Sequence, residues 1–320
     1  MTAKQRVAIV GAGLAGSLVA FGLRRRGCTP DVFDKSRGTG GRLAAARLGG
    51  SSADLGAPMI PTDLANELRA LSPELPIQAW TVQVANFQLE LQGERSLQVP
   101  VPRASALTRQ LLEGTTLYTQ SRVRAIEPLD AGWQLVMDDD SVHGPYDRVV
   151  LAVPGPQAVP LLAAVPALQQ RAQEVVMAPA WVMLAEQPAC PEALAEIDWL
   201  EGEHPVLARI CRDCGKPQRS GNIWQLQARE DWSAAHVDAH PDWIAEQLLH
   251  AVSDLAGAGF TPVTQRVHRW LYSQVAVSPG SEPLSPCGTL GVCGDWVGGA
   301  GLEGAWHSAQ RLLAAFDTGR

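Results

Sequence analysis

The feature that most constrains this chain is the stretch Val7–Gly27, an apolar run that Gly11, Gly13 and Gly16 interrupt. Lys4 and Arg6 precede it, so one interpretation is a signal peptide or a short membrane anchor. Three observations argue against that interpretation. The glycines break the run, Arg24–Arg26 stand where a small-residue cleavage site would be, and the run is marginal for a span of about 20 apolar residues.

The same stretch fits a strand, a glycine-rich turn and a helix. Val7–Val10 has the apolar character of a buried parallel strand, and Gly11–Gly16 fits the pattern G-x-G-x-x-G. A second short strand, Asp31–Phe33, ends at Asp34, where an acid would accept hydrogen bonds from a ribose. The helix N-terminus would face a pyrophosphate. The sequence therefore predicts a βαβ unit that binds FAD or NAD, since an acid at this position disfavours the 2′-phosphate of NADP.

Composition narrows the class of protein. The chain has 320 residues, is 46% hydrophobic and 18% charged, and carries a net charge of −7 with a pI near 5.5. This suits one large domain or two ordinary ones around a sizeable core. The absence of a basic stripe or tail argues against nucleic acid as a partner. We expect a cytoplasmic protein with a small-molecule substrate and no membrane partner, and the sequence leaves the oligomeric state open.

A second glycine cluster, Lys35–Arg42, follows the ribose acid without a gap. A nicotinamide dehydrogenase does not need it, whereas a flavoprotein of the glutathione-reductase type often bends such a segment against the same pyrophosphate. The arginine would then add a charge-assisted contact. The alternative is a flexible glycine-rich turn. Ala53–Ala57 would lead the chain toward the flavin ring.

At this point the chain resembles a known family. The stretches VAIVGAGLAGSLVAFGLRRRGCTPDVFDKSRGTGGRL, ADLGA, HRWLY and GVCGDWVGGAGLEGAWHSAQ are together similar to the renalase-like FAD-dependent oxidoreductases of the flavin amine oxidase superfamily. The resemblance implies an α/β fold with a glutathione-reductase-type Rossmann FAD-binding domain and a discontinuous mixed α+β substrate domain. It also implies non-covalent FAD.

The resemblance implies a reaction as well. These enzymes transfer a hydride from a mis-reduced dihydronicotinamide isomer of NAD(P)H to flavin N5, and oxygen reoxidises the flavin to give H2O2. The protein then supplies position and electrostatics. The pre-linker motif implies substrate contacts from His268, Arg269 and Tyr272, with Trp270 packed in the core; the alternative is a strand in which these residues serve structure.

The residues expected to bind the cofactor lie in five parts of the chain. They are Gly11, Gly13, Leu14, Ala15, Gly16, Asp34, Lys35, Arg37, Gly41, Arg42, Gly56, Ala57, Pro58, Val123, Gly294, Asp295, Gly301, Leu302 and Glu303.

The C-terminal part of this set has a physical rationale. Thr289–Cys293 reads as a strand, and Asp295 follows at the sheet edge where α/β proteins bind ligands. A helix over Leu302–Phe316 would point the positive end of its dipole at the flavin, which favours the charge gained on reduction. The alternative for Asp295 is a turn residue that closes the strand.

Because the cofactor motifs lie at the two ends, we predict discontinuous domains. Residues 1–57, 103–154 and 284–320 would form the FAD-binding domain, and residues 58–102 and 155–283 the substrate domain. Within the first, strands are expected around a hairpin turn at Asp138–Asp140, which we interpret as a solvated turn and not as a metal site. An amphipathic helix is expected over Pro241–Gly257.

The six cysteines leave minor alternatives open. Cys211 and Cys214 have the spacing of half a zinc site or of a redox pair, but no second ligand pair lies near them, so ordinary reduced thiols are favoured. Cys287 and Cys293 come close in sequence to the expected cofactor segment, which makes covalent flavin attachment conceivable; packed thiols are the simpler interpretation.

One departure bears on the substrate. Renalases carry Gln-Tyr-Phe after the DLGA motif, whereas this chain has Pro58-Met59-Ile60. Three functions therefore stay open: a renalase-like oxidase, an FAD-dependent amine oxidase or desaturase of a small metabolite, and a non-catalytic FAD-binding protein.

Overall fold

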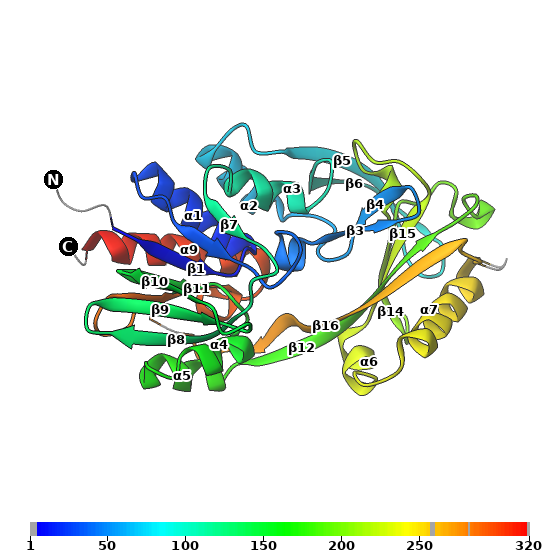
Figure 1. The fold of residues 1–320 in the computed structure, drawn as a ribbon. Coiled ribbons are helices and arrows are strands. Elements are labelled where there is room, and N and C mark those ends of the chain that lie inside the picture. The colour runs from blue at the N-terminus through cyan, green and yellow to red at the C-terminus, as the bar shows by residue number, and fades with distance from the viewer. Residues whose placement is uncertain (1–4, 257–259, 281, 319–320) are drawn as a thin grey trace. The chain divides into compact units, whose positions relative to one another are not determined.

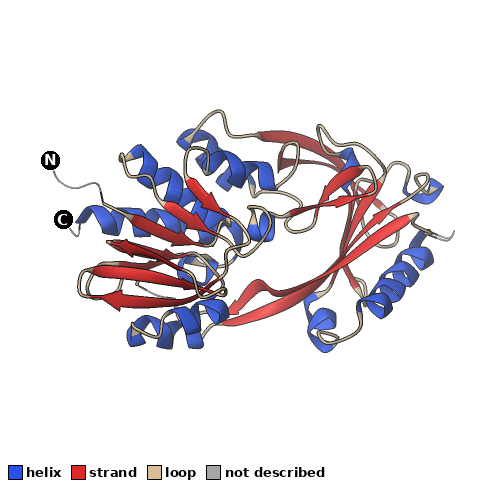
Figure 2. Cartoon of the chain, viewed as in Figure 1, coloured by secondary structure: helices blue, strands red, loops and turns tan. Residues whose placement is uncertain are grey.

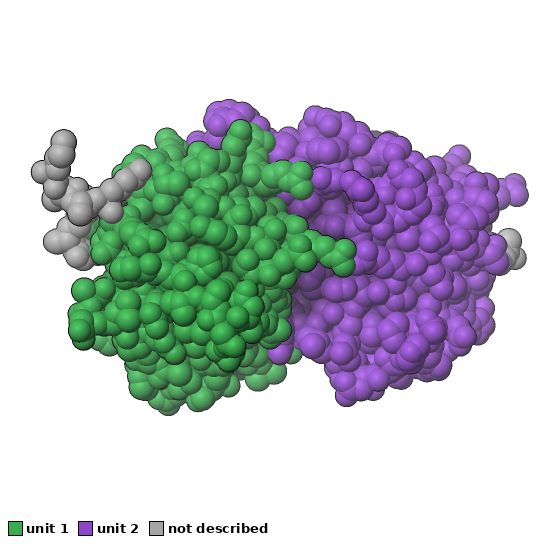
Figure 3. All heavy atoms as spheres, viewed as in Figure 1, with its two compact units in different colours: residues 1–41, 108–177, 274–320 green, residues 42–107, 178–273 purple. Residues whose placement is uncertain are grey.

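The computed structural model describes residues 5–256, 260–280 and 282–318, and the chain divides into two compact units (Figure 3). The first unit comprises residues 1–41, 108–177 and 274–320, and the second comprises residues 42–107 and 178–273. These units are defined by packing. They place residues 42–57 and 103–107 with the second unit, and residues 155–177 and 274–283 with the first, unlike the predicted domains. The assignment of cofactor and substrate roles to the domains stays a prediction.

The first unit is built on a five-stranded sheet in the order β17-β11-β1-β2-β7 (Figure 1). Its neighbouring strands all pair in parallel. The strands are β1 (Val7–Val10), β2 (Asp31–Phe33), β7 (Thr116–Tyr118), β11 (Arg148–Leu151) and β17 (Leu290–Val292). The predicted βαβ unit is confirmed, with α1 running from Leu14 to Arg25 between β1 and β2. Strands buried on both faces explain the unbroken apolar runs in the sequence.

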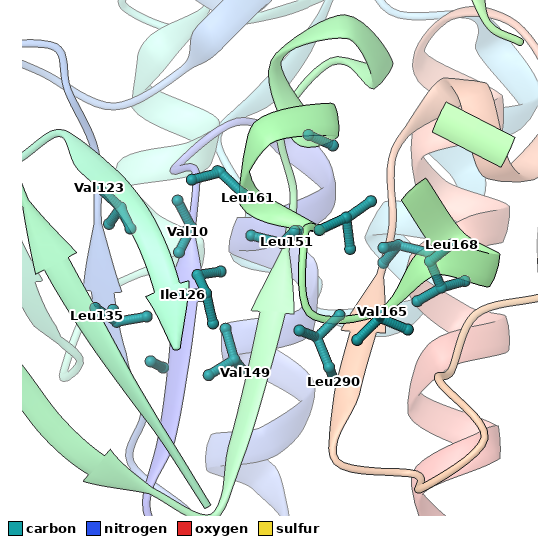
Figure 4. Close-up of a cluster of buried hydrophobic side chains, with 14 of the residues drawn as sticks. Val10, Val123, Ile126, Leu135, Val149, Leu151, Leu161, Val165, Leu168 and Leu290 are labelled. Atoms are coloured by element: carbon teal, nitrogen blue, oxygen red, sulfur yellow. The ribbon is translucent and has the colours of Figure 1, made fainter. Parts of the chain in front are cut away.

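Further elements of this unit cover the sheet. They are β8 (Val123–Leu129), β9 (Gly132–Met137), β10 (Val142–Tyr146), α4 (Gly155–Leu161), α5 (Pro166–Gln173), α8 (Asp295–Gly298) and α9 (Gly301–Thr318). Figure 4 shows Val10, Leu151 and Leu290 of the parallel sheet beside Ile126 of β8 and Leu161 of α4 in one apolar core. The predicted hairpin is confirmed as β9 and β10. This packing fixes the strand ends from which the site residues project.

The second unit holds a mixed seven-stranded sheet in the order β16-β12-β15-β14-β13-β5-β6. Its strands are β5 (Ile77–Ala85), β6 (Leu91–Pro100), β12 (Val176–Glu186), β13 (Trp199–Glu201), β14 (Leu207–Arg212), β15 (Ile223–Ala228) and β16 (Thr264–Val277), and β12 and β16 begin or end in the first unit. Figure 2 shows β12 and β16 as long strands side by side.

Helices and short elements complete the second unit. They are α2 (Thr62–Leu71), α3 (Ser105–Leu111, shared with the first unit), α6 (Glu230–Ala235), α7 (Pro241–Ala256), the hairpin β3 (Ala45–Leu48) and β4 (Ser51–Asp54), and the 3-10 turns η1 (Gly41–Leu43), η2 (Glu192–Leu194) and η3 (Asp213–Gly215). Helix α7 confirms the predicted amphipathic helix as far as residue 256; Gly257 lies outside the described residues. It buries Ile244, Leu248 and Val252 on one face of the sheet.

Candidate functional site

Five glycines of the first unit converge at the start of α1, and we call Gly11, Gly13, Gly16, Gly40 and Gly41 the glycine cradle. Gly13 and Gly40 form an isolated parallel bridge, and the Gly40 N–H donates to the Ala12 carbonyl at 2.9 Å. Gly41 has a φ of +54°, and a Cβ there would lie 3.3 Å from the Cα of Gly13. The two glycine clusters that the sequence separates by more than twenty residues are therefore in direct backbone contact.

Two of these glycines are required by packing. A Cβ on Gly16 would lie 2.0 Å from the Gly11 carbonyl oxygen, and one on Gly11 would lie 2.5 Å from the Ala152 carbonyl oxygen. Gly13 is different, because a Cβ there would meet only Gly40 at 3.9 Å. As the N-cap residue of α1, Gly13 has no side chain to accept from the free N–H groups of the first turn. The cradle thus fits an anionic pyrophosphate held by backbone N–H groups and the helix dipole.

Asp34 stands at the end of β2, where the sequence predicts the ribose acid. Its Oδ2 accepts from the Ala12 N–H at 2.8 Å, and its Oδ1 accepts from the Ser36 N–H at 2.7 Å. These two bonds fix the carboxylate against the glycine turn. A carboxylate offers about four acceptor positions, so Asp34 retains capacity for two ribose hydroxyls.

The other predicted residues of this segment point in different directions. Lys35 donates to Gln157 at 3.1 Å, and burial together with the charge of Arg122 lowers its pKa. Arg37 is exposed. Val123 opens β8 and is buried in the core of the unit. Leu14 and Ala15 form the first turn of α1 and are buried.

The C-terminal segment approaches the same sheet edge from β17. Asp295 is fully buried and begins α8, directly after Gly294, whose φ is +139°. Trp296 is also buried and donates to the Val153 carbonyl at 3.0 Å. Gly298 packs closely against α9, since a Cβ there would lie 2.3 Å from the Gly304 carbonyl oxygen.

Helix α9 starts at Gly301, one residue before the predicted start. Leu302 and Glu303 follow in its first turn, and Gly301 and Glu303 are exposed. The predicted position of these three residues at a helix N-terminus is therefore correct. Their proposed contact with the flavin stays a prediction.

The remaining predicted cofactor residues lie in the second unit. The Arg42 guanidinium donates to the Ser273 carbonyl at 3.0 Å, and the Arg42 carbonyl accepts from the Ala57 N–H at 2.9 Å. Gly56 is tightly packed, since a Cβ would lie 1.9 Å from the Arg42 carbonyl oxygen. Pro58 is buried. The DLGA segment is thus folded back on the Gly-Gly-Arg turn by backbone contacts.

The sequence did not predict the buried charged side chains that hold the DLGA segment in place. Lys216 Nζ contacts Asp54 at 2.8 Å and Asp213 at 2.6 Å, while the Arg219 guanidinium contacts the same carboxylates at 2.7 and 3.2 Å. We call these residues the four-charge cluster. Each of the four side chains is at most 2% exposed. Burial acts to raise the pKa of Asp54, but Lys216 and Arg219 outweigh it and hold that pKa below its usual value.

The other carboxyl of the cluster behaves differently. Burial and the neighbouring Asp54 charge raise the pKa of Asp213, although both cations oppose this. Two further buried contacts extend from the cluster, since Asp54 Oδ1 accepts from the Ala104 N–H at 2.7 Å and Gln225 donates to the carbonyls of Asp54 and Gly56. The only signal in the sequence is the density of charged residues over Cys211–Arg219, a stretch that also contains two cysteines.

The predicted substrate residues all lie on β16, but they do not share a face. Arg269 donates to the Val237 carbonyl at 2.6 Å and to Asp238 at 3.2 Å, and its guanidinium lies 5.8 Å from the Trp181 ring. His268 instead packs edge-on against Trp270 at 4.4 Å. Side chains alternate along a strand, so His268 and Tyr272 occupy the face opposite to Arg269. His268 and Arg269 both border a hollow of about 350 Å³ beside Trp181.

Trp270 and His268, which share one face of β16, differ in their contacts and charge. Trp270 donates to the Leu55 carbonyl at 3.1 Å and packs against a buried cluster, which confirms its predicted packing role. Burial, together with the charge of Arg266, lowers the pKa of His268 and favours its neutral form.

Of Pro58-Met59-Ile60, Ile60 is fully buried and pairs with Gln98, and Met59 packs against an apolar cluster.

The cysteines divide by burial. Burial raises the pKa of Cys211 and of Cys293 to about 12, whereas hydrogen bonds with Ser285 and Thr289 lower the pKa of the exposed Cys287 to about 7. Cys214 lies next to Asn222. Across the described ranges, no group of three His, Cys, Asp or Glu side chains is arranged to hold a metal ion. In the same ranges, no helix combines the length and the apolar character that a membrane crossing requires.

Comparisons with known proteins place these features. Residues 9–73 match a family model for an NAD(P)-binding Rossmann-like domain, and residues 81–312 match the model for flavin containing amine oxidoreductase. Renalase from Mus musculus is 24% identical over 301 residues, which cover 87% of each chain. A 1-hydroxycarotenoid 3,4-desaturase from Flavobacterium sp. (strain P99-3) is 36% identical over 74 residues, 23% of this chain and 15% of that protein.

Solved structures share the whole fold. Cyclohexylamine oxidase from Brevibacterium oxydans IH-35A superposes with a TM-score of 0.74 at 13% identity, covering 99% of this chain and 100% of that one. A fatty acid isomerase from P. acnes gives 0.75 at 11% identity, with 99% of each chain covered. Proteins with different reactions thus share this fold, so the fold alone does not identify the substrate.

Proposed function

The chain belongs to the family of flavin containing amine oxidoreductases, and from this premise we propose that it is a renalase-like oxidase of dihydronicotinamides. Its cofactor is FAD, and its first unit carries a Rossmann-like FAD-binding domain, which we propose is of the glutathione-reductase type. The observation that carries the proposal is the alignment with renalase across 87% of both chains.

Bound FAD would accept the hydride at N5 and return the electrons to oxygen. The overall reaction balances as dihydronicotinamide isomer, O2 and one proton giving NAD(P)+ and H2O2. The residues of the chain would hold and orient the two molecules. In the proposal, the glycine cradle and the α1 N-terminus bind the pyrophosphate of FAD, Asp34 binds its ribose, and Asp295 and the α9 N-terminus bind the flavin end.

On the substrate side, we assign His268 and Tyr272 to substrate contact, because they share one face of β16. A neutral imidazole can both donate and accept a hydrogen bond, as a carboxamide requires. Arg269 is left out of this assignment, because its guanidinium is engaged by Val237 and Asp238.

The test is an anaerobic titration of the purified holoprotein with mis-reduced dihydro-NAD(P) isomers, followed by the visible absorbance of the flavin. We expect stoichiometric bleaching with formation of NAD(P)+, and slow or no bleaching with ordinary 4-dihydro NADH. Bleaching by amines but not by any dihydronicotinamide would replace the proposal with amine oxidation. Flavin that no donor reduces would favour a binding protein without catalysis.

A further inference from the structure

Two cysteines on different connecting segments lie at one end of the seven-stranded sheet. Cys190 lies in the segment after β12, and Cys214 belongs to η3, which follows β14. The Asn222 side chain, directly before β15, contacts both segments: its Oδ1 accepts from the Cys214 thiol at 3.9 Å, and its Nδ2 donates to the Gln187 carbonyl at 3.3 Å. The fold therefore brings the segments that carry the two thiols to a common neighbour.

A second neighbour shared by the two thiols is the Arg212 guanidinium. Its Nη1 donates to the Ala195 carbonyl at 3.2 Å, next to the Leu194 carbonyl, which accepts from the Cys190 thiol at 3.7 Å. Burial acts to lower the pKa of Arg212, but a hydrogen bond with the Cys214 thiol and the charges of both cysteines raise it. One guanidinium thus lies beside both sulfur atoms.

The two thiols also act on each other. Burial raises the pKa of Cys190, and the neighbouring Cys214 adds to this rise, while Arg212 opposes it. Charges interact in this way only over short distances in salt solution, since the screening length is about 8 Å. Both cysteines are only partly buried, so a small solute can reach them from water.

Cys211, which the spacing in the sequence makes the alternative partner of Cys214, lies in a different environment. It belongs to β14, is fully buried, and packs with Trp80 and Trp199 in an apolar cluster. Burial raises its pKa to about 12. Oxidants react with the thiolate of an accessible cysteine, and Cys211 meets neither condition. The structure therefore favours Cys190 over Cys211 as the partner of Cys214.

We propose that Cys190 and Cys214 are a peroxide-sensitive thiol pair that closes to an intrachain disulfide. The thiolate of one cysteine attacks hydrogen peroxide, which gives a sulfenic acid and releases hydroxide. The second thiol attacks that sulfur, forms the S–S bond, and its proton leaves with the hydroxyl group as water. In sum, two thiols and H2O2 give one disulfide and two water molecules, and the sulfur atoms lose the two electrons that the peroxide gains. The proposed oxidase reaction releases this oxidant, but the pair requires only its presence.

The disulfide would act on the four-charge cluster. Cys214 directly follows Asp213, whose carboxylate contacts Lys216 at 2.6 Å and Arg219 at 3.2 Å. A bond to Cys190 would fasten η3 to the segment after β12 and so oppose the opening of the cluster. A cross-link also restricts the unfolded chain. We therefore expect the oxidised protein to unfold at a urea concentration about 1 M higher than the reduced protein.

The test oxidises the folded wild-type holoprotein with one equivalent of hydrogen peroxide and then blocks the remaining thiols with iodoacetamide. Trypsin cuts after Arg209 and Arg212, so that Cys190, Cys211 and Cys214 fall on three separate peptides. We expect the joined peptides of Cys190 and Cys214, lighter by two hydrogen atoms than their sum, to exceed every pair that contains Cys211 about tenfold. Dithiothreitol should separate them.

Two controls use the same peptide map. In urea the fold no longer selects a partner, so the excess over the pairs that contain Cys211 should disappear. Cys287, which contacts the hydroxyls of Ser285 and Thr289, should gain oxygen atoms instead of a partner. The two controls show whether the cross-link follows from the fold or from reactivity alone.

Variants make the same point through stability. Cys190→Ser and Cys214→Ser should each abolish both the cross-link and the peroxide-dependent shift of the urea midpoint, while Cys287→Ser should keep both. Pairing of Cys214 with Cys211 in the folded wild-type protein would overturn the proposal. So would a folded protein in which Cys190 and Cys214 only gain oxygen atoms, or in which both stay reduced under excess peroxide.

Discussion

The glycine cradle and the four-charge cluster position two parts of the chain in opposite ways. The cradle uses backbone alone, and its glycines are so close that a Cβ on Gly41 would lie 3.3 Å from the Cα of Gly13. The cluster uses long charged side chains that are at most 2% exposed. Backbone contacts between glycines leave N–H groups open to a ligand, whereas a closed set of ion pairs leaves nothing to bind. This difference is why we propose a binding role for the cradle and a supporting role for the cluster.

The largest effect is expected in the cluster. Lys216→Met would leave two buried carboxylates with only Arg219 as a counter-charge, and we expect the free energy of unfolding to fall by about 3–5 kcal/mol. Urea unfolding measures this. Arg124→Met, which breaks the exposed pair with Asp140, should cost less than about 1 kcal/mol. Equal losses in the two variants would remove the distinction between a supporting cluster and an ordinary surface pair.

The next effect concerns the cradle. Gly16→Ala would press a Cβ against the Gly11 carbonyl, so we expect a loss of about 1–3 kcal/mol together with most of the bound flavin. Gly38→Ala is the control, because a Cβ there meets nothing within 4 Å. The ratio of flavin absorbance to protein absorbance reports the outcome. Full flavin content in Gly16→Ala would contradict the binding role of the cradle.

The sequence predicted the cradle and not the cluster, for a physical reason. The cradle combines two local patterns: a strand, a turn and a helix within Val7–Arg25, and the second glycine cluster, which contains Gly40 and Gly41. The cluster joins Asp54 to side chains more than 150 residues away, and no local sequence pattern predicts such a pairing. On β16 the sequence predicted the motif, but the alternation of side chains along the strand places Arg269 and His268 on opposite faces.

A smaller effect tests Asp34, the acid beside the cradle that we propose binds the ribose of FAD. Asp34→Ala should weaken FAD binding about 10- to 100-fold through lost charged hydrogen bonds, with little change in stability when excess FAD is present. Asp147→Ala, at an exposed acid that accepts from the Arg6 N–H, is the control. Titration of apoprotein with FAD gives both dissociation constants. If they agree, backbone contacts alone account for binding.

The smallest effect is a difference in reactivity among buried and exposed thiols, and it requires no change in the free energy of unfolding. Cys211 lies two residues before Asp213 of the four-charge cluster, and Cys293 directly follows β17, two residues before Asp295. Both thiols are buried, and burial raises their pKa values to about 12. Cys287, with a pKa of about 7, should react with iodoacetamide at a rate that rises with pH through 7, since the thiolate reacts. Mass spectrometry of labelled peptides should find Cys287 modified and the other two unmodified. Labelling of Cys293 in the folded holoprotein would show that the end of β17 opens.

The central claim is that the first unit holds FAD through backbone contacts and without a covalent bond. The most direct measurement is the visible spectrum of the purified protein before and after acid precipitation. We predict a flavin spectrum with one FAD per chain, all of it released into the supernatant. Flavin that stays with the precipitate would contradict non-covalent binding, and a protein that remains colourless after incubation with FAD would contradict the assignment of the cradle.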